Sequence, residues 1–355
     1  MSDGMLKKYY QFELGQVCSR LSSGKGIAAK EISEHGVYPV FGGNGLRGYS
    51  DRKNFEGQCA IIGRQGAFCG NVRFFSGEAY MTEHAVVVCA NEKSDIKYLS
   101  YLLGTLNLGR LSGQSAQPGL SVKTLSKQVI QLPDISKQRQ IAKVLSAFDE
   151  KIELNTQINH NLEEQAKAIF DDMFPGITDG DSCVGDIITP KRGKSLLSKD
   201  AVPGDVPVIA GGLEPATFHN VSNTTPPVLT ISASGANAGY VSLWTIPVWS
   251  SDSSFIDSSM TGNVYFWYVL LKKRQKEIFD AQTGSAQPHI YPQHIAQMSL
   301  ANISKQDIEA FTNTVKPIFD TIGENKKQNK RLAQLRDTLL PKLMSGEIDV
   351  SEVEI

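Results

Sequence analysis

Two stretches of the sequence share one apolar pattern, and this pattern decides the fold. Residues 141–173 read IAKVLSAFDE KIELNTQINH NLEEQAKAIF DDM, and residues 311–343 read FTNTVKPIFD TIGENKKQNK RLAQLRDTLL PKL. In both stretches, mostly apolar side chains recur at alternating steps of four and three residues, which is the a/d pattern of a coiled coil. These seam positions are Ile141, Leu145, Phe148, Ile152, Asn155, Asn159, Leu162, Ala166, Ile169 and Met173 in the first stretch, and Phe311, Val315, Ile318, Ile322, Asn325, Asn329, Leu332, Arg336, Leu339 and Leu343 in the second. Asparagines interrupt both patterns at the same two central positions: Asn155 and Asn159 in the first, Asn325 and Asn329 in the second. Two matching seams predict two long helices that pair with each other.

The asparagines predict how the helices meet. If the helices run antiparallel, the centre of one seam faces the centre of the other, so that Asn155 meets Asn329 and Asn159 meets Asn325. A buried amide in a seam costs stability but fixes the register, because any slip leaves the amide without a partner. We therefore expect these four residues to form the central layers of an antiparallel coiled coil and to fix its register.

Signals for the ends of both helices flank the seams. Ser136 and Ser304 are candidate N-caps, and Asp307 follows Ser304 at the spacing of a capping box. Pro175-Gly176 and Ser345-Gly346 stand where the helices should stop. Each helix is therefore expected to begin directly before its seam and to end directly after it.

The helices belong to a repeat of about 170 residues that covers the whole chain. Ser115–Pro118 recurs as Ser285–Pro288, and Ile135–Gln138 recurs as Ile303–Gln306. A period of this length is not a solenoid unit, which spans ~20–50 residues. The chain therefore contains two copies of one domain, each followed by a linker and a long helix.

The segments outside the helices are typical of strands and loops. Cys59–Ile62 and Ala85–Val88 read as buried strands in the first copy, as do Val228–Ile231 and Tyr240–Trp244 in the second. The predicted fold class is α+β: two similar mixed α/β domains joined by two long helices in an antiparallel coiled coil, with a pseudo-twofold internal repeat. The expected boundaries are 1–110 for the first domain, 111–176 for its linker and helix, 177–280 for the second domain, and 281–355 for the second linker and helix.

Charge and cysteine content exclude some classes of protein. The formal net charge is −1, which argues against a polycation that binds nucleic acid without specificity, although neutral donors can still read bases. Five cysteines without a CxxC pair fit reduced thiols in a cytosolic protein. Because no apolar run approaches the ~18 residues of a membrane span, we expect a soluble, cytoplasmic protein that makes no membrane contact.

Several motifs together resemble a known family. Leu132–Ile141, which reads LPDISKQRQI, precedes the first long helix, and YPVFGGNG at 38–45 and IIGRQG at 61–66 lie in the first domain. This combination resembles the specificity subunits of type I restriction–modification systems, and the likeness covers essentially the whole chain. The second copy departs from the pattern, since Leu300-Ala301-Asn302 replaces Leu-Pro-Asp.

The resemblance implies a DNA sequence-specificity subunit without catalysis. Its two target-recognition domains would read the two halves of a bipartite site in double-stranded DNA. Its paired helices would act as a ruler and dock two modification (methyltransferase) subunits, which two restriction subunits (endonuclease and translocase) can join. The chain would hold no cofactor or metal itself, because the partner subunits would bind S-adenosylmethionine, ATP and Mg²⁺.

Enzyme motifs are weaker explanations of the same residues. Phe41–Gly45 matches the F-x-G-x-G pattern of methyltransferases, but it leads into LRGYS, which is not the helix start that such a loop requires. Pro133-Asp134 and Asp149–Lys151 spell a nuclease pattern, yet Asp149–Lys151 lies on the heptad helix rather than on a strand beside Mg²⁺. We therefore expect no enzyme. The alternatives are a coiled-coil interaction scaffold without DNA specificity and a stand-alone DNA methyltransferase.

Residue types predict where DNA would be read. Arginine is the usual bidentate reader of guanine and asparagine pairs with adenine, so Arg47, Arg64 and Arg73 are candidates in the first domain. Residues 200–271 contain no Lys or Arg, so the second domain is expected to hold phosphates at its edges and to read bases with neutral groups. The candidate DNA-binding residues are Lys25, Asn44, Arg47, Arg64, Gln65, Arg73, Lys191, Arg192, Lys194, Asn220, Ser234 and Asn237.

Overall fold

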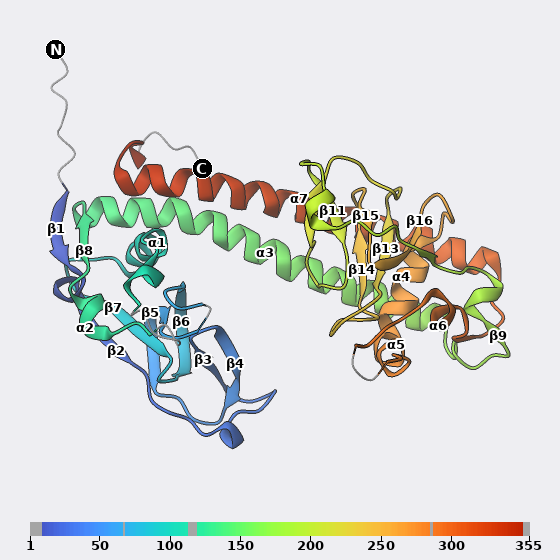
Figure 1. Cartoon of the computed structure of the whole chain (residues 1–355), viewed down its shortest axis with the longest axis horizontal. Coiled ribbons are helices and arrows are strands. Elements are labelled where there is room, and N and C mark those ends of the chain that lie inside the picture. Colours follow the sequence, from blue (N-terminus) through green and yellow to red (C-terminus); the bar gives the residue numbers. More distant parts are fainter. Residues whose placement is uncertain (1–8, 67, 113–118, 285–286, 351–355) are drawn as a thin grey trace, which may run out of the picture. The chain divides into compact units, whose positions relative to one another are not determined.

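The computed structural model describes residues 9–66, 68–112, 119–284 and 287–350. The chain divides into two compact units: unit 1 holds residues 1–152 and 331–355, and unit 2 holds residues 153–330. Each unit contains one mixed α/β domain and one segment of each long helix (Figure 1). Of the repeated motif, Ser115–Pro118 and the pair Ser285-Ala286 lie outside the described residues.

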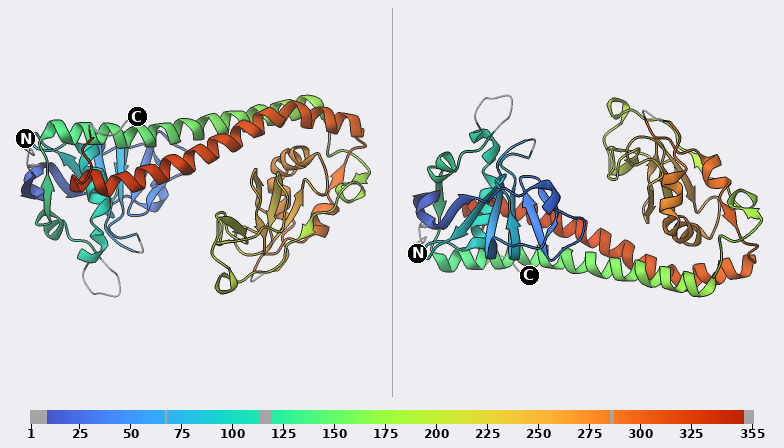
Figure 2. Two further views of the ribbon diagram at one scale, coloured as in Figure 1. Left: turned by 90° about the horizontal axis from the view of Figure 1, so that it is seen from above. Right: turned by 90° about the horizontal axis from the view of Figure 1, so that it is seen from below.

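The two predicted long helices are α3 (Ile135–Met173) and α7 (Lys305–Ser345). Within each unit their segments lie side by side (Figure 2), and every seam position is buried or half-buried. Gly176 and Gly346, which follow the two helix ends, have φ of +68° and +71°, a left-handed conformation that favours glycine and ends helices. The expected stops are therefore confirmed.

The two N-caps differ from each other. Ser304 Oγ accepts a hydrogen bond from Asp307 N at 3.1 Å, as predicted for the start of α7. At the start of α3 the prediction is wrong, because Ser136 lies inside the first turn. Asp134 Oδ1 accepts from Lys137 N at 3.0 Å instead. Aspartate caps a helix as well as serine does, so α3 begins before the predicted residue.

Unit 1 is built on a six-stranded sheet of order β2-β7-β5-β6-β3-β4, antiparallel except for the β3–β6 pair. Its strands are β2 (Cys18–Ser23), β3 (Tyr38–Gly42), β4 (Gly45–Ser50), β5 (Phe55–Gly63), β6 (Val72–Met81) and β7 (Ala85–Ala90). A separate ribbon pairs β1 (Tyr10–Glu13) with β8 (Val129–Leu132). The helical elements are η1 (Leu14–Val17), η2 (Ala29–Glu31), α1 (Ile96–Thr105), η3 (Leu108–Leu111) and α2 (Val122–Ser126). Both strands predicted in this domain are present and buried, within β5 and β7.

Unit 2 repeats this plan with smaller sheets. One sheet has the order β10-β16-β13-β14 and another the order β12-β11-β15. The strands are β10 (Lys191–Arg192), β11 (Val206–Ile209), β12 (Thr217–His219), β13 (Val228–Ser232), β14 (Val241–Trp244), β15 (Trp249–Ser250) and β16 (Ser253–Asp257), and β9 (Ser182–Cys183) pairs with β17 (Ser299–Leu300). The helical elements are η4 (Val184–Asp186), η5 (Ser198–Asp200), α4 (Val264–Lys273), α5 (Gln275–Asp280) and α6 (Pro292–Ala296). The predicted strands appear as β13 and β14.

The long helices contribute to the core of each domain. In unit 2, Phe170 of α3 and Phe174, which directly follows α3, pack against Phe266 of α4 and Phe311 of α7, with ring centroids 5.2–5.8 Å apart. In unit 1, the fully buried Ile141 and Leu145 of α3 belong to one core with residues of α1 and with Leu343 of α7. Burial of a large apolar side chain contributes about 1.5–3 kcal/mol, so these contacts fix the helix segments to the domain of their own unit.

The five cysteines are free. Burial raises the pKa of the Cys18 and Cys59 thiols to about 12, and such thiols stay protonated and unreactive at neutral pH. Among the residues that the structure describes, no helix is both long enough and apolar enough to cross a membrane.

Gly323 of α7 makes a close approach that predicts an unusual mutational effect. A helical Gly→Ala change normally stabilises by about 0.5–1 kcal/mol. At Gly323, however, a Cβ would lie 2.7 Å from Thr245 Oγ1 and 2.9 Å from its Cγ2, and overpacking of this kind costs about 1–3 kcal/mol. We expect Gly323→Ala to lower the midpoint of thermal unfolding. Gly104→Ala in α1 is the control, since a Cβ there has nothing within 4 Å, and it should raise the midpoint; equal gains from both variants would contradict the prediction.

Candidate nucleic-acid interface

Two loops with similar backbone geometry occupy corresponding places in the two copies. Loop A, residues 64–71, joins β5 to β6 in unit 1, and loop B, residues 233–240, joins β13 to β14 in unit 2. Glycines with a left-handed φ stand at matching positions: Gly66 (+77°), Gly70 (+88°), Gly235 (+81°) and Gly239 (+90°). A Cβ at Gly70 would lie 2.2 Å from Gly109 N. The glycines repeated in the sequence are therefore explained by the backbone of the loops.

Equivalent main-chain hydrogen bonds hold the two loops, and we call this shared set of bonds the loop frame. Arg64, the first residue of loop A, donates its N–H to the His84 carbonyl oxygen at 2.9 Å. Ala233, the first residue of loop B, donates its N–H to the Asp252 carbonyl oxygen at 3.1 Å. His84 and Asp252 therefore occupy equivalent positions beside the loops, although one is an imidazole and the other a carboxylate.

Two further pairs of residues correspond in the same way. Gln65 and Ser234 each form an isolated β-bridge with a residue of the linker that follows their domain. Lys25 and Lys194 each donate a backbone N–H at 2.9 Å to the last carbonyl of β6 and of β15, respectively. The structure thus brings predicted residues of both domains to matching positions around the loops.

In unit 1, polar side chains surround an open recess of about 420 Å³. Its polar lining consists of Asn44, Arg47, Gln65 and His84. Arg47 lies close over Gly42, where a Cβ would come within 2.7 Å of Arg47 Cδ. Amide, guanidinium and imidazole groups at one recess can donate hydrogen bonds to base acceptors such as guanine O6 and N7.

The other predicted cations of unit 1 are tied to the protein to different degrees. Arg73 is exposed and donates from Nη2 to the Asn44 carbonyl oxygen at 3.1 Å, so it borders the recess. Arg64 is half-buried and donates to the Leu120 carbonyl oxygen at 3.3 Å and to Ser23 Oγ at 3.4 Å. Arg64 therefore braces loop A from within the domain, and a DNA contact by its side chain stays a prediction.

In unit 2, an aspartate joins two of the predicted residues. Arg192 Nη2 donates to Asp252 Oδ1 at 2.6 Å, and Ser234 Oγ donates to Asp252 Oδ2. The side chains of Arg192 and Asp252 are 42% and 39% exposed, so both remain accessible to a ligand. Lys191 stands beside Arg192 on β10, and Asn237 lies in loop B with Ser234. Asn220, in contrast, follows β12 of the other sheet and does not belong to this group.

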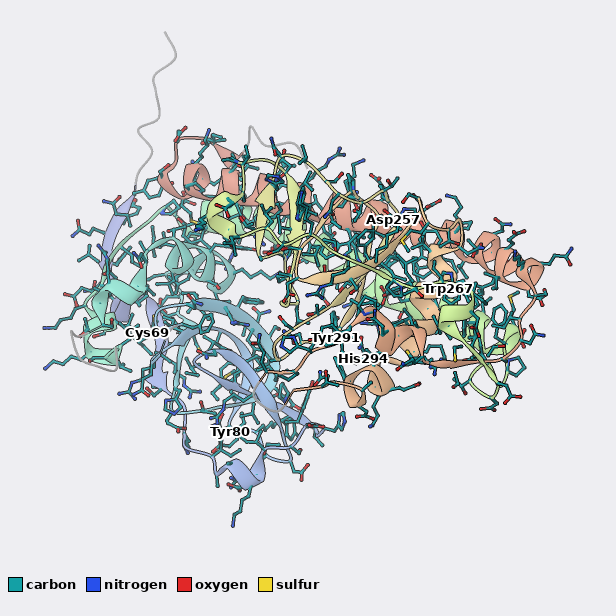
Figure 3. The ribbon with its side chains drawn as sticks, turned by 45° about the vertical axis from the view of Figure 1, so that its right-hand side comes forward. Cys69, Tyr80, Asp257, Trp267, Tyr291 and His294 are labelled. Carbon is teal, nitrogen blue, oxygen red and sulfur yellow. The ribbon has the colours of Figure 1, made fainter. Side chains whose placement is uncertain are left out.

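Sequence reasoning missed three features that border the loops. His84 and Asp252 were not selected, because only the tertiary hydrogen bonds show that they stand next to loops A and B. The third feature is a row of rings in the linker of unit 2: His289, which forms the bridge with Ser234 of loop B, stacks on Tyr291 at a centroid distance of 6.0 Å. Tyr291 in turn meets His294 edge-on at 5.5 Å (Figure 3). Within the described ranges, no three His, Cys, Asp or Glu residues are grouped as metal ligands.

Comparison with known proteins shows which family this arrangement is similar to. Residues 7–164 match the type I restriction modification DNA specificity domain. This match covers the first domain, its linker and most of α3. It is 41% identical over 140 residues to the type I restriction enzyme EcoprrI specificity subunit of Escherichia coli, a match that spans 38% of this chain and 35% of that protein. The match to the type I restriction enzyme MjaIX specificity subunit of Methanocaldococcus jannaschii is 26% identical over 302 residues, and spans 72% of this chain and 70% of the relative.

A solved structure shares the fold of this chain. The type I restriction–modification S subunit from M. genitalium has a TM-score of 0.63 at 20% sequence identity, and the match covers 97% of this chain and 98% of that chain. At this identity the likeness concerns the fold alone, and it extends over both domains and both helices.

The expected asparagine layers are present in the part of the coiled coil that belongs to unit 2. Asn155 Nδ2 donates to Asn329 Oδ1 at 2.8 Å, and Asn325 Nδ2 donates to Asn159 Oδ1 at 2.9 Å. These contacts require α3 and α7 to run antiparallel here, as predicted. Asn155 also donates to Gln328 Oε1 at 2.6 Å. Asn155 and Asn159 are 1% and 9% exposed, so the amides have little access to water; their role in fixing the register stays a prediction.

The part of the coiled coil in unit 1 has a different polar contact. Arg336, which occupies a seam position of α7, donates to Asp149 of α3, and the same carboxylate accepts from the Tyr101 hydroxyl of α1. Burial, followed by the hydrogen bond to Asp149, raises the pKa of Tyr101 well above its usual range. This cluster links both helices to the domain of unit 1 through one carboxylate.

Proposed function

We propose that this chain is the DNA sequence-specificity subunit of a type I restriction–modification complex, with one domain reading each half of a bipartite double-stranded site. The observation that supports this function most strongly is the shared frame of loops A and B. The backbone is held alike in both domains, while Gln65 stands where Ser234 stands and His84 where Asp252 stands. A shared loop backbone that carries different side chains suits two domains that both bind DNA but read different base sequences.

The recess of unit 1 and the Arg192–Asp252–Ser234 group of unit 2 suggest different base preferences. In unit 1, Arg47 and Gln65 supply hydrogen-bond donors, and Arg47 would pair with guanine in the major groove. In unit 2, Asp252 supplies carboxylate acceptors, which suit the amino group of cytosine. The ion pair with Arg192 partly balances the negative charge of Asp252. Lys25 and Lys194 would contact phosphates, which positions the duplex without selecting sequence.

The partner and cofactor assignments follow from the family and form part of the proposal. The chain would have no catalysis and hold no cofactor or metal of its own. Two modification subunits would dock on it and bind S-adenosylmethionine, and two restriction subunits would bring ATP and Mg²⁺ chemistry. The register of α3 against α7, set by the asparagine layers, would define the spacer between the half-sites that the complex accepts.

A binding experiment tests this function. The chain, assembled with its modification subunits, is titrated against a duplex that contains the site methylated in the source cell and against a scrambled duplex of equal length. Specific protein–DNA complexes exceed non-specific binding by about 10³–10⁷-fold, so we expect a preference of at least ~1,000-fold. Equal affinity for both duplexes would instead support a coiled-coil scaffold without DNA specificity.

A further inference from the structure

A second polar surface of unit 2 lies between α7 and the edge strand β14. It is an open groove of about 610 Å³. We call it the lysine groove, after the four lysines that line it: Lys272 of α4, and Lys326, Lys327 and Lys330 of α7. Two acidic residues, Glu163 and Glu214, also line it. Four lysines against two glutamates leave a net charge of +2 within the lining, although the whole chain is nearly neutral. Lys327 also pairs at 3.5 Å with Glu324, which lies outside the lining.

The fold does not require this charge, because the other copy has a groove of opposite sign. In unit 1, a groove of about 590 Å³ is bounded by β6, α1 and the two long helices. Its charged residues are Lys97, Arg336, Asp149, Glu150 and Asp337, that is, two cations and three acids. Lys97 pairs with Glu150 at 3.0 Å, and Arg336 pairs with Asp149. The same architecture therefore exists without an excess of lysine.

The lysine groove begins where loop B ends. Tyr240, the last residue of loop B, lines the groove, and its N–H donates to the Asn237 carbonyl oxygen at 3.0 Å. Lys272 Nζ lies 4.0 Å from the centroid of the Tyr240 ring and donates to the Val241 carbonyl oxygen at 3.0 Å. A ligand that leaves the candidate reading site past Asn237 therefore meets Tyr240 and Lys272 first, and then the lysines of α7.

We propose that the lysine groove binds the phosphodiester backbone of the DNA next to the half-site read by unit 2. This inference rests on the proposed function and adds a contact that is independent of sequence. Lys326 and Lys330 are four residues apart, about 6 Å along the helix axis, while each DNA strand presents a phosphate every ~3.4 Å of its axis. Their spacing is close to twice that interval, so the two exposed lysines can each reach a separate phosphate of one strand. The unit 1 groove, with its acidic excess, makes no such contact.

The salt dependence of binding tests this proposal, because each phosphate neutralised by a lysine adds about 0.9 to the slope of −log K against log salt. We expect the triple variant Lys326→Gln, Lys327→Gln, Lys330→Gln, assembled with its modification subunits, to lower this slope by about 2–3, equally for target and scrambled duplexes. The single variant Lys330→Gln should lower it by about 0.9. A slope equal to that of the wild type would overturn the proposal.

Controls distinguish a failure of the lysine-groove proposal from a failure of the proposed function. Lys316→Gln is the matched variant, since Lys316 is exposed on the same helix, pairs with Asp320 at 2.6 Å and lies outside the groove; its slope should not change. A wild-type complex without sequence preference would refute the proposed function itself. Retained preference with an unchanged slope would refute only the lysine groove. Loss of assembly with the modification subunits in the triple variant would show that the groove docks protein and would also overturn the proposal.

Discussion

Exchanging the first domain for that of another family member should change one half of the recognised DNA site and leave the other half intact. The repeat motivates this expectation, because each unit has its own core and its own loop frame. Each wrong base pair costs about 1–3 kcal/mol, so three altered base pairs should weaken binding to the original site by at least ~100-fold. Mapping methylated sites in cells that carry the chimera measures both halves at once.

The structure shows where the exchange should be cut. A cut at the predicted boundary, residue 110, would take η1 from one protein and α2 from the other. These two elements pack closely, since a Cβ at Gly15 of η1 would lie 3.3 Å from Ser126 of α2. Grafting residues 14–128 keeps η1 with α2 and leaves the β1–β8 ribbon and both long helices to the host. We expect this graft to fold, and a change in both half-sites at once would refute independent reading.

Replacing Asn155 alone with leucine should destabilise unit 2, whereas replacing Asn155 and Asn329 together should not. The single change removes two hydrogen bonds that Asn155 Nδ2 donates, to Asn329 Oδ1 at 2.8 Å and to Gln328 Oε1 at 2.6 Å, and each such bond contributes about 0.5–1.5 kcal/mol. Removing both amides leaves an apolar layer, which is nearly neutral or stabilising. Denaturant unfolding of the single and double variants measures the difference, with Asn161→Leu on the exposed face of α3 as the control.

The same layers make a prediction about specificity. A variant in which all four asparagines of the two layers are leucine should be more stable than the wild type, yet should accept a wider range of spacer lengths between the half-sites, because buried amides then no longer penalise a slip of α3 against α7. Selection of bound duplexes from a library of spacers measures this. An unchanged spacer preference would show that the asparagines do not set the register.

The sequence predicted the helices well because the heptad pattern is local and long. It predicted the start of α7 from Ser304 and Asp307, but it placed the start of α3 at Ser136 because Asp134 was not considered as a cap. Pro317 lies inside α7, where proline usually breaks a helix, and the helix nevertheless continues to Ser345. The buried Phe311 and Phe319 flank this proline in the core of unit 2, so tertiary packing outweighs the local cost.

The candidate site was less accessible to sequence reasoning. Gln65 and Ser234 could be selected because each stands beside a repeated glycine. His84 and Asp252 could not, because they are equivalent only through hydrogen bonds to residues about twenty positions earlier in the chain. The sequence also could not predict that the Arg64 side chain is half-buried, since this side chain donates a hydrogen bond to Leu120 of the linker, far along the sequence. Contacts of this kind depend on the packed sheet and not on local pattern.

The frame around loops A and B has a consequence for how such proteins diversify. The bonds that connect each loop to His84 or Asp252 join a peptide N–H to a peptide oxygen, so they persist whichever side chain is present. If the side chains around the loops read bases as proposed, a new specificity would arise by single codon changes at Gln65, Ser234, His84 or Asp252 without rebuilding the backbone. Selection would then explore new target sequences from an intact fold, and a host population would carry many recognition variants on one scaffold.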